Sequence, residues 1–109
     1  MAIRMTEQVY LVLLALADHP RHGYGVVQRV LELSDGAVRL SAGTLYGVLD
    51  RLTAAGWITE SGEEVVDGRL RRYYRVTDDG AATLAAETAR LESLTRRAAA
   101  VLRPGVAGA

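Results

Sequence analysis

Four arginines lie within nine residues of the sequence, in a chain of 109 residues whose formal net charge is zero. They are Arg69, Arg71, Arg72 and Arg75. A guanidinium group is permanently charged and presents a rigid fork of donors, which suits it to phosphate and carboxylate oxygens. Residues 58–67, directly before this segment, carry four acids and no base. The pattern indicates contact with an anionic partner, and a solvated charge run balanced by the acids is the alternative.

The alternation of side chains along a strand divides these arginines between two faces. Arg71 and Arg75 fall on one face and Arg72 falls on the other. One face must cover the core, so we do not expect every arginine to reach a ligand. Arg69, Arg71 and Arg72 are the candidates for phosphate or minor-groove contact, whereas Arg75 is expected to pair with a nearby acid.

Small and hydroxyl-bearing residues precede the arginines in the segment SAGTLYGVLDRLTAAG, which begins at Ser41. Its large apolar residues recur at i, i+3, i+4 and i+7, which predicts a helix with one narrow face toward a core. At 100° per residue, the opposite face of this helix is nearly bare. A bare face lets the backbone approach a DNA groove, and hydroxyls beside the positive helix terminus can donate hydrogen bonds to phosphates.

Two charged residues of this helix are able to read base edges directly. Arg51 can bind guanine, and Asp50 can accept a hydrogen bond from the amino group of cytosine. With so few side chains of this kind, we expect a large share of shape readout. The alternative is that Gly43 and Thr44 only start the helix and that Tyr46 only packs. The expected DNA-contacting residues are Ser41, Gly43, Thr44, Tyr46, Gly47, Asp50, Arg51, Arg69, Arg71 and Arg72.

Hydrophobic periodicity and turn residues predict four helices and a hairpin. Thr6 is a suitable N-cap for a mostly buried first helix, and Asp67-Gly68 is typical of a hairpin turn. Gly56 is a suitable C-cap for the third helix. The predicted order is helices at 9–16, 26–33 and 41–56, strands at 57–61 and 70–76, and a last helix from 77–79 to 103. This order predicts a mainly α fold with a small β-hairpin, a winged helix-turn-helix whose third helix reads DNA.

The last predicted helix carries an apolar stripe that finds no partner in so small a chain. The stripe consists of Leu84, Leu91, Leu94, Ala98 and Val101, a heptad-like pattern. Twenty-five helical residues extend about 37 Å, beyond the rest of the domain. We therefore expect a homodimer whose interface the first helix completes through Val9, Leu13 and Leu16. The alternative is that the last helix packs only on its own domain.

Length and composition fit one small domain and exclude several classes of protein. The absence of cysteine excludes disulfides and cysteine metal sites. The longest apolar run, residues 9–17, is far shorter than the ~20 residues that span a bilayer, and the amino terminus lacks a signal-peptide pattern. We therefore expect a soluble cytoplasmic protein without membrane contact. The predicted organisation is a DNA-binding domain at 1–77, a dimerisation helix at 78–103 and a flexible tail at 104–109.

Three segments together resemble the PadR family of bacterial transcriptional regulators: HGYGVVQRV, SAGTLYGVLDRLTAAGWI and GRLRRYYRVTDDG. The resemblance covers roughly residues 9–90, and the single last helix resembles the short subfamily. It implies a homodimeric winged helix, usually a repressor, that binds a palindromic operator. It also implies an aromatic small-molecule effector in some relatives, although the last helix here has no aromatic residue. Ala42 and Gly47 stand where the family's SPGTLYP pattern has prolines, and Gly47 is expected to loosen the start of the reading helix.

Other functions have less support in the sequence. No nucleophile–base pair, carboxylate dyad, phosphate-binding loop or metal-ligand cluster occurs at a useful spacing, so neither an enzyme nor a cofactor is expected. His19 and His22 are a weak candidate for a metal site, and His22 better suits a turn or the cap of the second helix. Trp57 better suits a core or hinge position than ligand stacking. The main alternative function is a winged-helix module that binds another protein instead of DNA.

Overall fold

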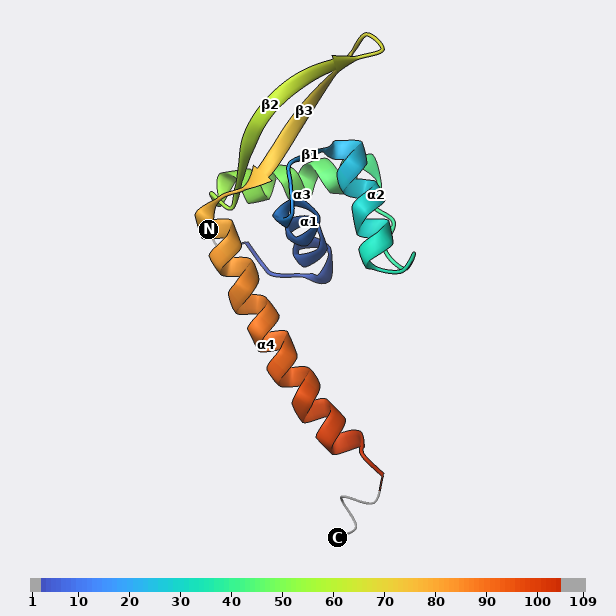
Figure 1. The fold of residues 1–109 in the computed structure, drawn as a ribbon, viewed down its shortest axis with the longest axis vertical. Coiled ribbons are helices and arrows are strands. Elements are labelled where there is room, and N and C mark those ends of the chain that lie inside the picture. Colours follow the sequence, from blue (N-terminus) through green and yellow to red (C-terminus); the bar gives the residue numbers. More distant parts are fainter. Residues whose placement is uncertain (1–2, 105–109) are drawn as a thin grey trace.

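The structure, a computed structural model, describes residues 3–104 and consists of a helical body from which two elements project. Its elements are α1 (Glu7–Ala17), β1 (Arg21–His22), α2 (Gly23–Leu33), α3 (Ala42–Ala54), β2 (Ile58–Val66), β3 (Arg69–Val76) and α4 (Asp78–Leu102). The β2–β3 hairpin, which we call the wing, extends from one end of the body, and α4 extends from the other (Figure 1). This architecture confirms the predicted mainly helical fold with a small sheet.

Local sequence signals begin the helices where they were expected. The Thr6 hydroxyl accepts a hydrogen bond from the Val9 amide and caps α1, and the Ser41 hydroxyl accepts one from the Thr44 amide and caps α3. Each contact satisfies an amide that the helix leaves without a partner in its first turn. The Thr77 hydroxyl caps α4 in the same way.

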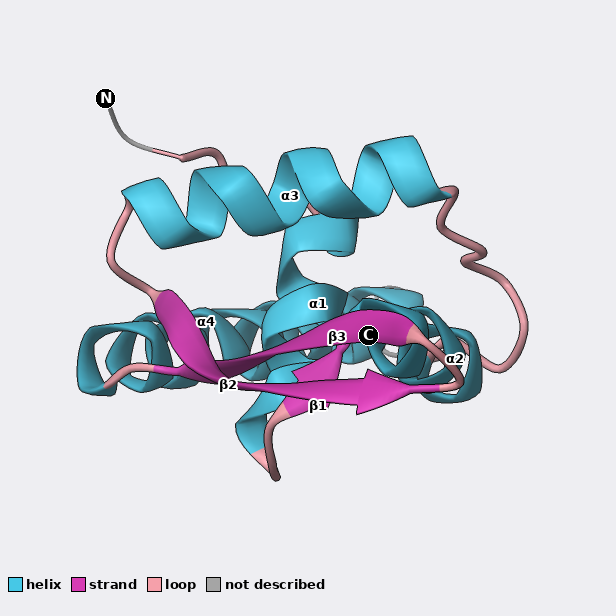
Figure 2. Ribbon diagram, turned by 90° about the horizontal axis from the view of Figure 1, so that it is seen from above, coloured by secondary structure: helices cyan, strands magenta, loops and turns pink. Residues whose placement is uncertain are grey.

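The core lies where α1, α2 and α3 meet the base of the wing. It contains most of α1, the apolar stripe of α3 and the first residue of β2, Ile58. The four stripe residues predicted on the third helix are all buried: Leu45, Val48, Leu49 and Leu52. Because this stripe faces inward, the small residues on the opposite side of α3 are exposed. Figure 2 shows α3 running along one side of the body.

The sheet has three antiparallel strands in the order β1-β3-β2. Asp67 and Gly68 both have positive φ, 52° and 74°, as a type I′ hairpin turn requires. β2 runs to Val66, well beyond the predicted end at residue 61, because its polar second half is held by pairing with β3. β1 was not predicted; it pairs with Tyr73 and Tyr74, and the Arg21 guanidinium donates to the Ala15 carbonyl at 2.7 Å.

The start of α4 is attached closely to the end of α3. α3 ends in a Schellman motif. The backbone amides of Gly56 and Trp57 donate hydrogen bonds of 3.0 Å each to the carbonyls of Thr53 and Leu52. The Thr77 hydroxyl donates to the Gly56 carbonyl at 2.6 Å. A side chain at Gly80 would overlap the Trp57 carbonyl oxygen, so only glycine fits this crossing. Trp57 is half-buried against the core, which agrees with the core alternative of its predicted core or hinge position.

α4 leaves the body after its first turns. Gly80 and Leu84 are its buried residues, and Tyr10 of α1 shares a hydrogen bond of 2.7 Å with Thr88. The molecule measures 66 × 28 × 23 Å as a result. The predicted flexible tail lies outside the described residues apart from Pro104. Within residues 3–104, none of the helices combines the length and the apolar composition needed to cross a bilayer.

Two predictions about the body need correction. Val9, Leu13 and Leu16 are fully buried inside the chain's own core, so they have no surface to offer a second copy. The second helix begins at Gly23, three residues before the first apolar residue of its predicted span, because His22 caps it, one of the two roles predicted for that residue, and the two glycines lie in its first turn.

Candidate nucleic-acid interface

The outward face of α3 presents every candidate predicted on that helix. Ser41, Gly43, Thr44, Tyr46, Gly47, Asp50 and Arg51 are all exposed. A Cβ atom added at Gly43 or at Gly47 would meet nothing within 4 Å, so the backbone is open to solvent at both positions. A partner can therefore approach this helix as closely as its backbone permits.

Polar groups collect at the amino end of α3. The Ser41 hydroxyl donates to the Thr44 hydroxyl at 3.0 Å while it accepts from the Thr44 amide at 3.2 Å. The Arg51 side chain folds back along the helix, and its Nε donates to the Gly47 carbonyl at 3.3 Å. The helix N-terminus is thus surrounded by hydroxyls, with the guanidinium of Arg51 one to two turns further along.

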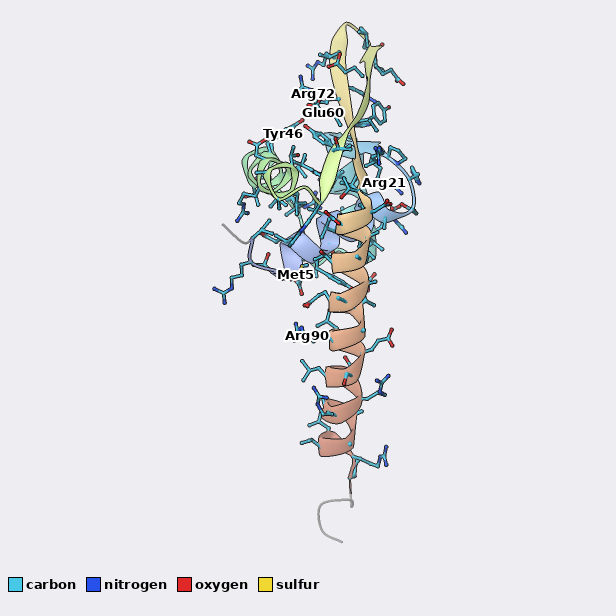
Figure 3. All side chains as sticks on the ribbon, turned by 90° about the vertical axis from the view of Figure 1, so that its left-hand side faces the viewer. Met5, Arg21, Tyr46, Glu60, Arg72 and Arg90 are labelled. Atoms are coloured by element: carbon cyan, nitrogen blue, oxygen red, sulfur yellow. The ribbon has the colours of Figure 1, made fainter. Side chains whose placement is uncertain are left out.

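Tyr46 both packs and remains accessible. Its hydroxyl oxygen lies so close to Gly23 that a Cβ atom there would approach it to 2.8 Å, and the residue is 51% exposed. Figure 3 shows Tyr46 pointing from α3 toward the base of the wing, near Arg72 and Glu60. The predicted packing is therefore observed beside Gly23, and contact of the exposed part of Tyr46 with DNA stays a prediction.

The arginines of the wing differ in their surroundings. Arg69, Arg72 and Arg75 are exposed and Arg71 is half-buried. The Arg72 Nε lies 3.2 Å from a Glu60 carboxylate oxygen and 3.9 Å from one of Glu63. The ion pair predicted for Arg75 is therefore made by Arg72; within residues 3–104, Arg75 makes none. Burial raises the pKa of the neighbouring Tyr74 hydroxyl, and the charge of Arg72 opposes that rise.

His22 connects β1, α2 and β3. Its Nδ1 accepts from the Gly25 amide at 3.3 Å, which confirms the predicted cap of the second helix. Its ring meets that of Tyr73 edge to face at 5.3 Å between centroids, and its Nε2 lies 3.3 Å from Arg71. Burial and then the charge of Arg71 lower the pKa of His22. Among the described residues no group of three or more metal-binding side chains occurs.

A hollow of about 420 Å³ joins the two halves of the predicted site. It lies between the start of α2, α3 and the outer part of β3. Its lining residues are His22, Gly23, Tyr24, Tyr46, Arg69, Leu70, Arg71 and Arg72. Tyr24, which sequence reasoning did not select, is 66% exposed at this edge. The motif HGYG contained it, but only the fold brings that motif beside the arginines.

Comparison with known proteins points to one family. The model of the transcriptional regulator PadR-like family matches residues 12–86. A relative from Mycobacterium tuberculosis, "Transcriptional regulator Rv3488", is 46% identical over 80 residues, which cover 73% of this chain and 71% of the relative.

Solved structures share the fold. A PadR family transcriptional regulator from Eggerthella lenta is 30% identical with a TM-score of 0.71, covering 90% of this chain and 83% of that one. Bacillus subtilis PadR, solved in complex with operator DNA, has a TM-score of 0.67 at 21% identity, covering 76% of this chain and 47% of that one. At that identity the second likeness shows the fold alone.

Proposed function

This chain belongs to the PadR-like family of transcriptional regulators, and from that premise we propose that it is a homodimeric repressor of a palindromic operator. The observation that carries the proposal is the hollow in which Tyr46 of α3 lies beside Arg69, Arg71 and Arg72 of the wing. Such a surface can place a helix in the major groove while arginines of the hairpin contact the flanking backbone. A bacterial operator lies in the cytoplasm, which is where this function would be carried out.

We assign positioning on DNA chiefly to backbone phosphates. Ser41 and Thr44 stand at the N-terminus of α3, where amides and hydroxyls suit an anionic oxygen. Arg69, Arg71 and Arg72 border the hollow and would bind phosphates along the adjacent strand or in the minor groove. Direct base reading falls to Arg51 and Asp50, so the sequence preference would depend largely on DNA shape.

The proposed dimer rests on α4. Leu94 is 47% exposed and Val101 is 77% exposed, although both belong to the apolar stripe. Leu91 is half-buried, Ala98 is exposed and Leu84 is covered by the chain's own core. A two-fold dimer through this stripe would present two copies of α3 to half-sites about 34–36 Å apart. An effector that releases DNA would act where two α4 helices meet, and α4 offers it no aromatic ring.

A test of the interface is the binding of duplex DNA from the region upstream of the gene, measured over a range of salt concentrations. Arg71→Ala with Arg72→Ala should weaken binding and reduce the magnitude of the salt slope by up to ~1.8, since each phosphate contact contributes ~0.9. Arg96→Ala with Arg103→Ala removes two arginines near the end of α4 that lie away from the apolar stripe, and it should change neither. An unchanged salt slope for the variant with Arg71→Ala and Arg72→Ala would show that these arginines of the wing do not contact DNA.

The second candidate function is the binding of another protein instead of DNA. The equal numbers of acids and arginines in the wing favour it, since a neutral hairpin adds no net attraction to DNA. Failure of the wild-type protein to bind the upstream duplex at low salt, together with retention of a protein partner on α3, would support this function over repression.

A further inference from the structure

The wing carries its glutamates on one strand and its arginines on the other. Glu60, Glu63 and Glu64 lie on β2, while the arginines lie on β3. Glu60 and Glu63 both approach Arg72, at 3.2 Å and 3.9 Å. An arginine that borders the proposed DNA site is therefore already occupied by carboxylates of its own hairpin.

A bulge in β2 produces this arrangement. In a regular strand, Glu60 and Glu63 would point to opposite faces, because they are three residues apart and side chains alternate with a period of two. The register shifts between Glu60 and Gly62: Glu60 lies opposite Tyr74, and Glu63 lies opposite Arg72. Tyr74 and Arg72 are two residues apart on the same face of β3. The extra residue, Ser61, thus turns both carboxylates to the face of Arg72.

The pairs are open to solvent. The exposed side-chain fractions are 49% for Arg72, 56% for Glu60 and 54% for Glu63. Exposed ion pairs of this kind are weak, so a correctly placed phosphate can displace the carboxylates. Because the carboxylates must be displaced first, the ion pair lowers the net gain from a contact between Arg72 and a phosphate.

We propose that Glu60 and Glu63 limit the affinity of the DNA interface, because they occupy Arg72 and oppose its attraction to phosphates. The inference rests on the proposed function. Phosphate attraction contributes to non-specific and to operator binding, and operator binding adds the contacts of α3. The cost of displacing the two carboxylates from Arg72 is common to both complexes, so the acids weaken both by a similar factor and keep the attraction of the wing to DNA of any sequence low.

The test compares the wild type with Glu60→Gln/Glu63→Gln on two probes, a 30-base-pair duplex of random sequence and the duplex from the upstream region. On the random duplex at 0.1 M salt, affinity should rise roughly three- to eightfold, with up to ~0.9 added to the salt slope, the value of one phosphate contact. On the upstream duplex the rise should be similar, because the same ion pair is displaced there. Glu32→Gln/Glu92→Gln removes two acids that pair with arginines elsewhere and should leave both affinities unchanged.

Arg72→Ala tests whether a gain in affinity comes from releasing Arg72 or from removing negative charge near the DNA. In the Arg72→Ala background, the two glutamine substitutions should no longer increase affinity for the random duplex. A gain that persists there overturns the assignment. If the wild type binds the upstream duplex and the glutamine variant binds no more tightly, the inference fails alone. If the wild type binds neither duplex, the proposed function fails and the inference fails with it.

Discussion

At the scale of single residues, His22 makes a contact that depends on its protonation state. Its Nδ1 accepts from the Gly25 amide, and Arg71 approaches its Nε2. The cap requires an uncharged ring, because a protonated imidazole has no acceptor. Only one nitrogen of the neutral ring accepts, so the cap assigns the hydrogen to Nε2, and the Arg71 guanidinium acts on the ring through its charge, which disfavours protonation. The residue therefore couples the start of α2 to the wing through its charge.

This coupling predicts a dependence of stability on pH. The pKa of His22 is lowered from its ordinary value of 6.5 by burial and by the charge of Arg71, so its stabilisation is complete above pH 6.5 and is lost as the pH falls further, through the lower pKa of the folded state. Between pH 7.5 and 5.5 we expect the wild type to lose part of the stabilisation from the cap, up to about 1 kcal/mol. Thermal unfolding should show a smaller decrease in Tm for His22→Asn, which keeps a capping acceptor and does not titrate. Equal decreases would contradict the prediction.

At the scale of elements, α3 combines a buried stripe with an outward face that gives up helix stability. Gly47 lies inside the helix, and a Cβ atom there would meet nothing within 4 Å. Glycine in a helix interior is less favourable than alanine because the unfolded chain loses more freedom on folding. The chain thus keeps a residue that costs stability and leaves the backbone bare at the proposed DNA surface.

Gly47→Ala separates the two effects. The free energy of unfolding should rise by about 0.5–1 kcal/mol, since the helix gains a better helix former without a clash. The affinity for the upstream duplex should fall, because the added methyl group holds the backbone away from the groove. Denaturant unfolding and salt-matched binding measure the two quantities on the same sample. Higher stability with unchanged affinity would show that the backbone at Gly47 does not approach DNA.

At the scale of the whole molecule, α4 extends far beyond the body to which its first turns are attached. Its second half carries Leu94, Val101 and Leu102 on exposed surface. Such apolar side chains on an isolated helix indicate a partner surface when they form a stripe. The wing and α4 project from opposite ends of the body (Figure 1), so a dimer through α4 would leave both proposed DNA surfaces uncovered.

Two alanines near the end of α4 test the dimer with matched changes. Ala98 belongs to the stripe, and Ala100 lies about 200° around the helix from it. Ala98→Glu should convert the dimer to a monomer in sedimentation experiments and weaken binding to a two-fold duplex, because it buries a charge in the apolar interface. Ala100→Glu adds the same charge on the other side and should remain dimeric. Identical behaviour of the two variants would exclude the stripe as the interface.

The sequence by itself determined those features that depend on neighbouring residues. The caps at Thr6 and Ser41, the buried stripe of α3 and the turn at Asp67-Gly68 are local, since each depends on a few residues and a known period. From these features the fold class and the bare outward face of α3 could be predicted. The position of the arginines on the second strand of the hairpin could also be predicted, but the acids that pair with them could not.

Tertiary structure alone decided what depends on residues far apart. β1 has two residues and no periodicity, so only pairing with β3 reveals it, and with it the place of His22 and Tyr24 beside the arginines. The bulge after Glu60 changes which acids face Arg72, which strand alternation cannot anticipate. The burial of Leu13 likewise depends on three helices meeting around it. The physical reason is common to all three: local periodicity determines which face a residue occupies, but only packing between distant segments determines what that face meets.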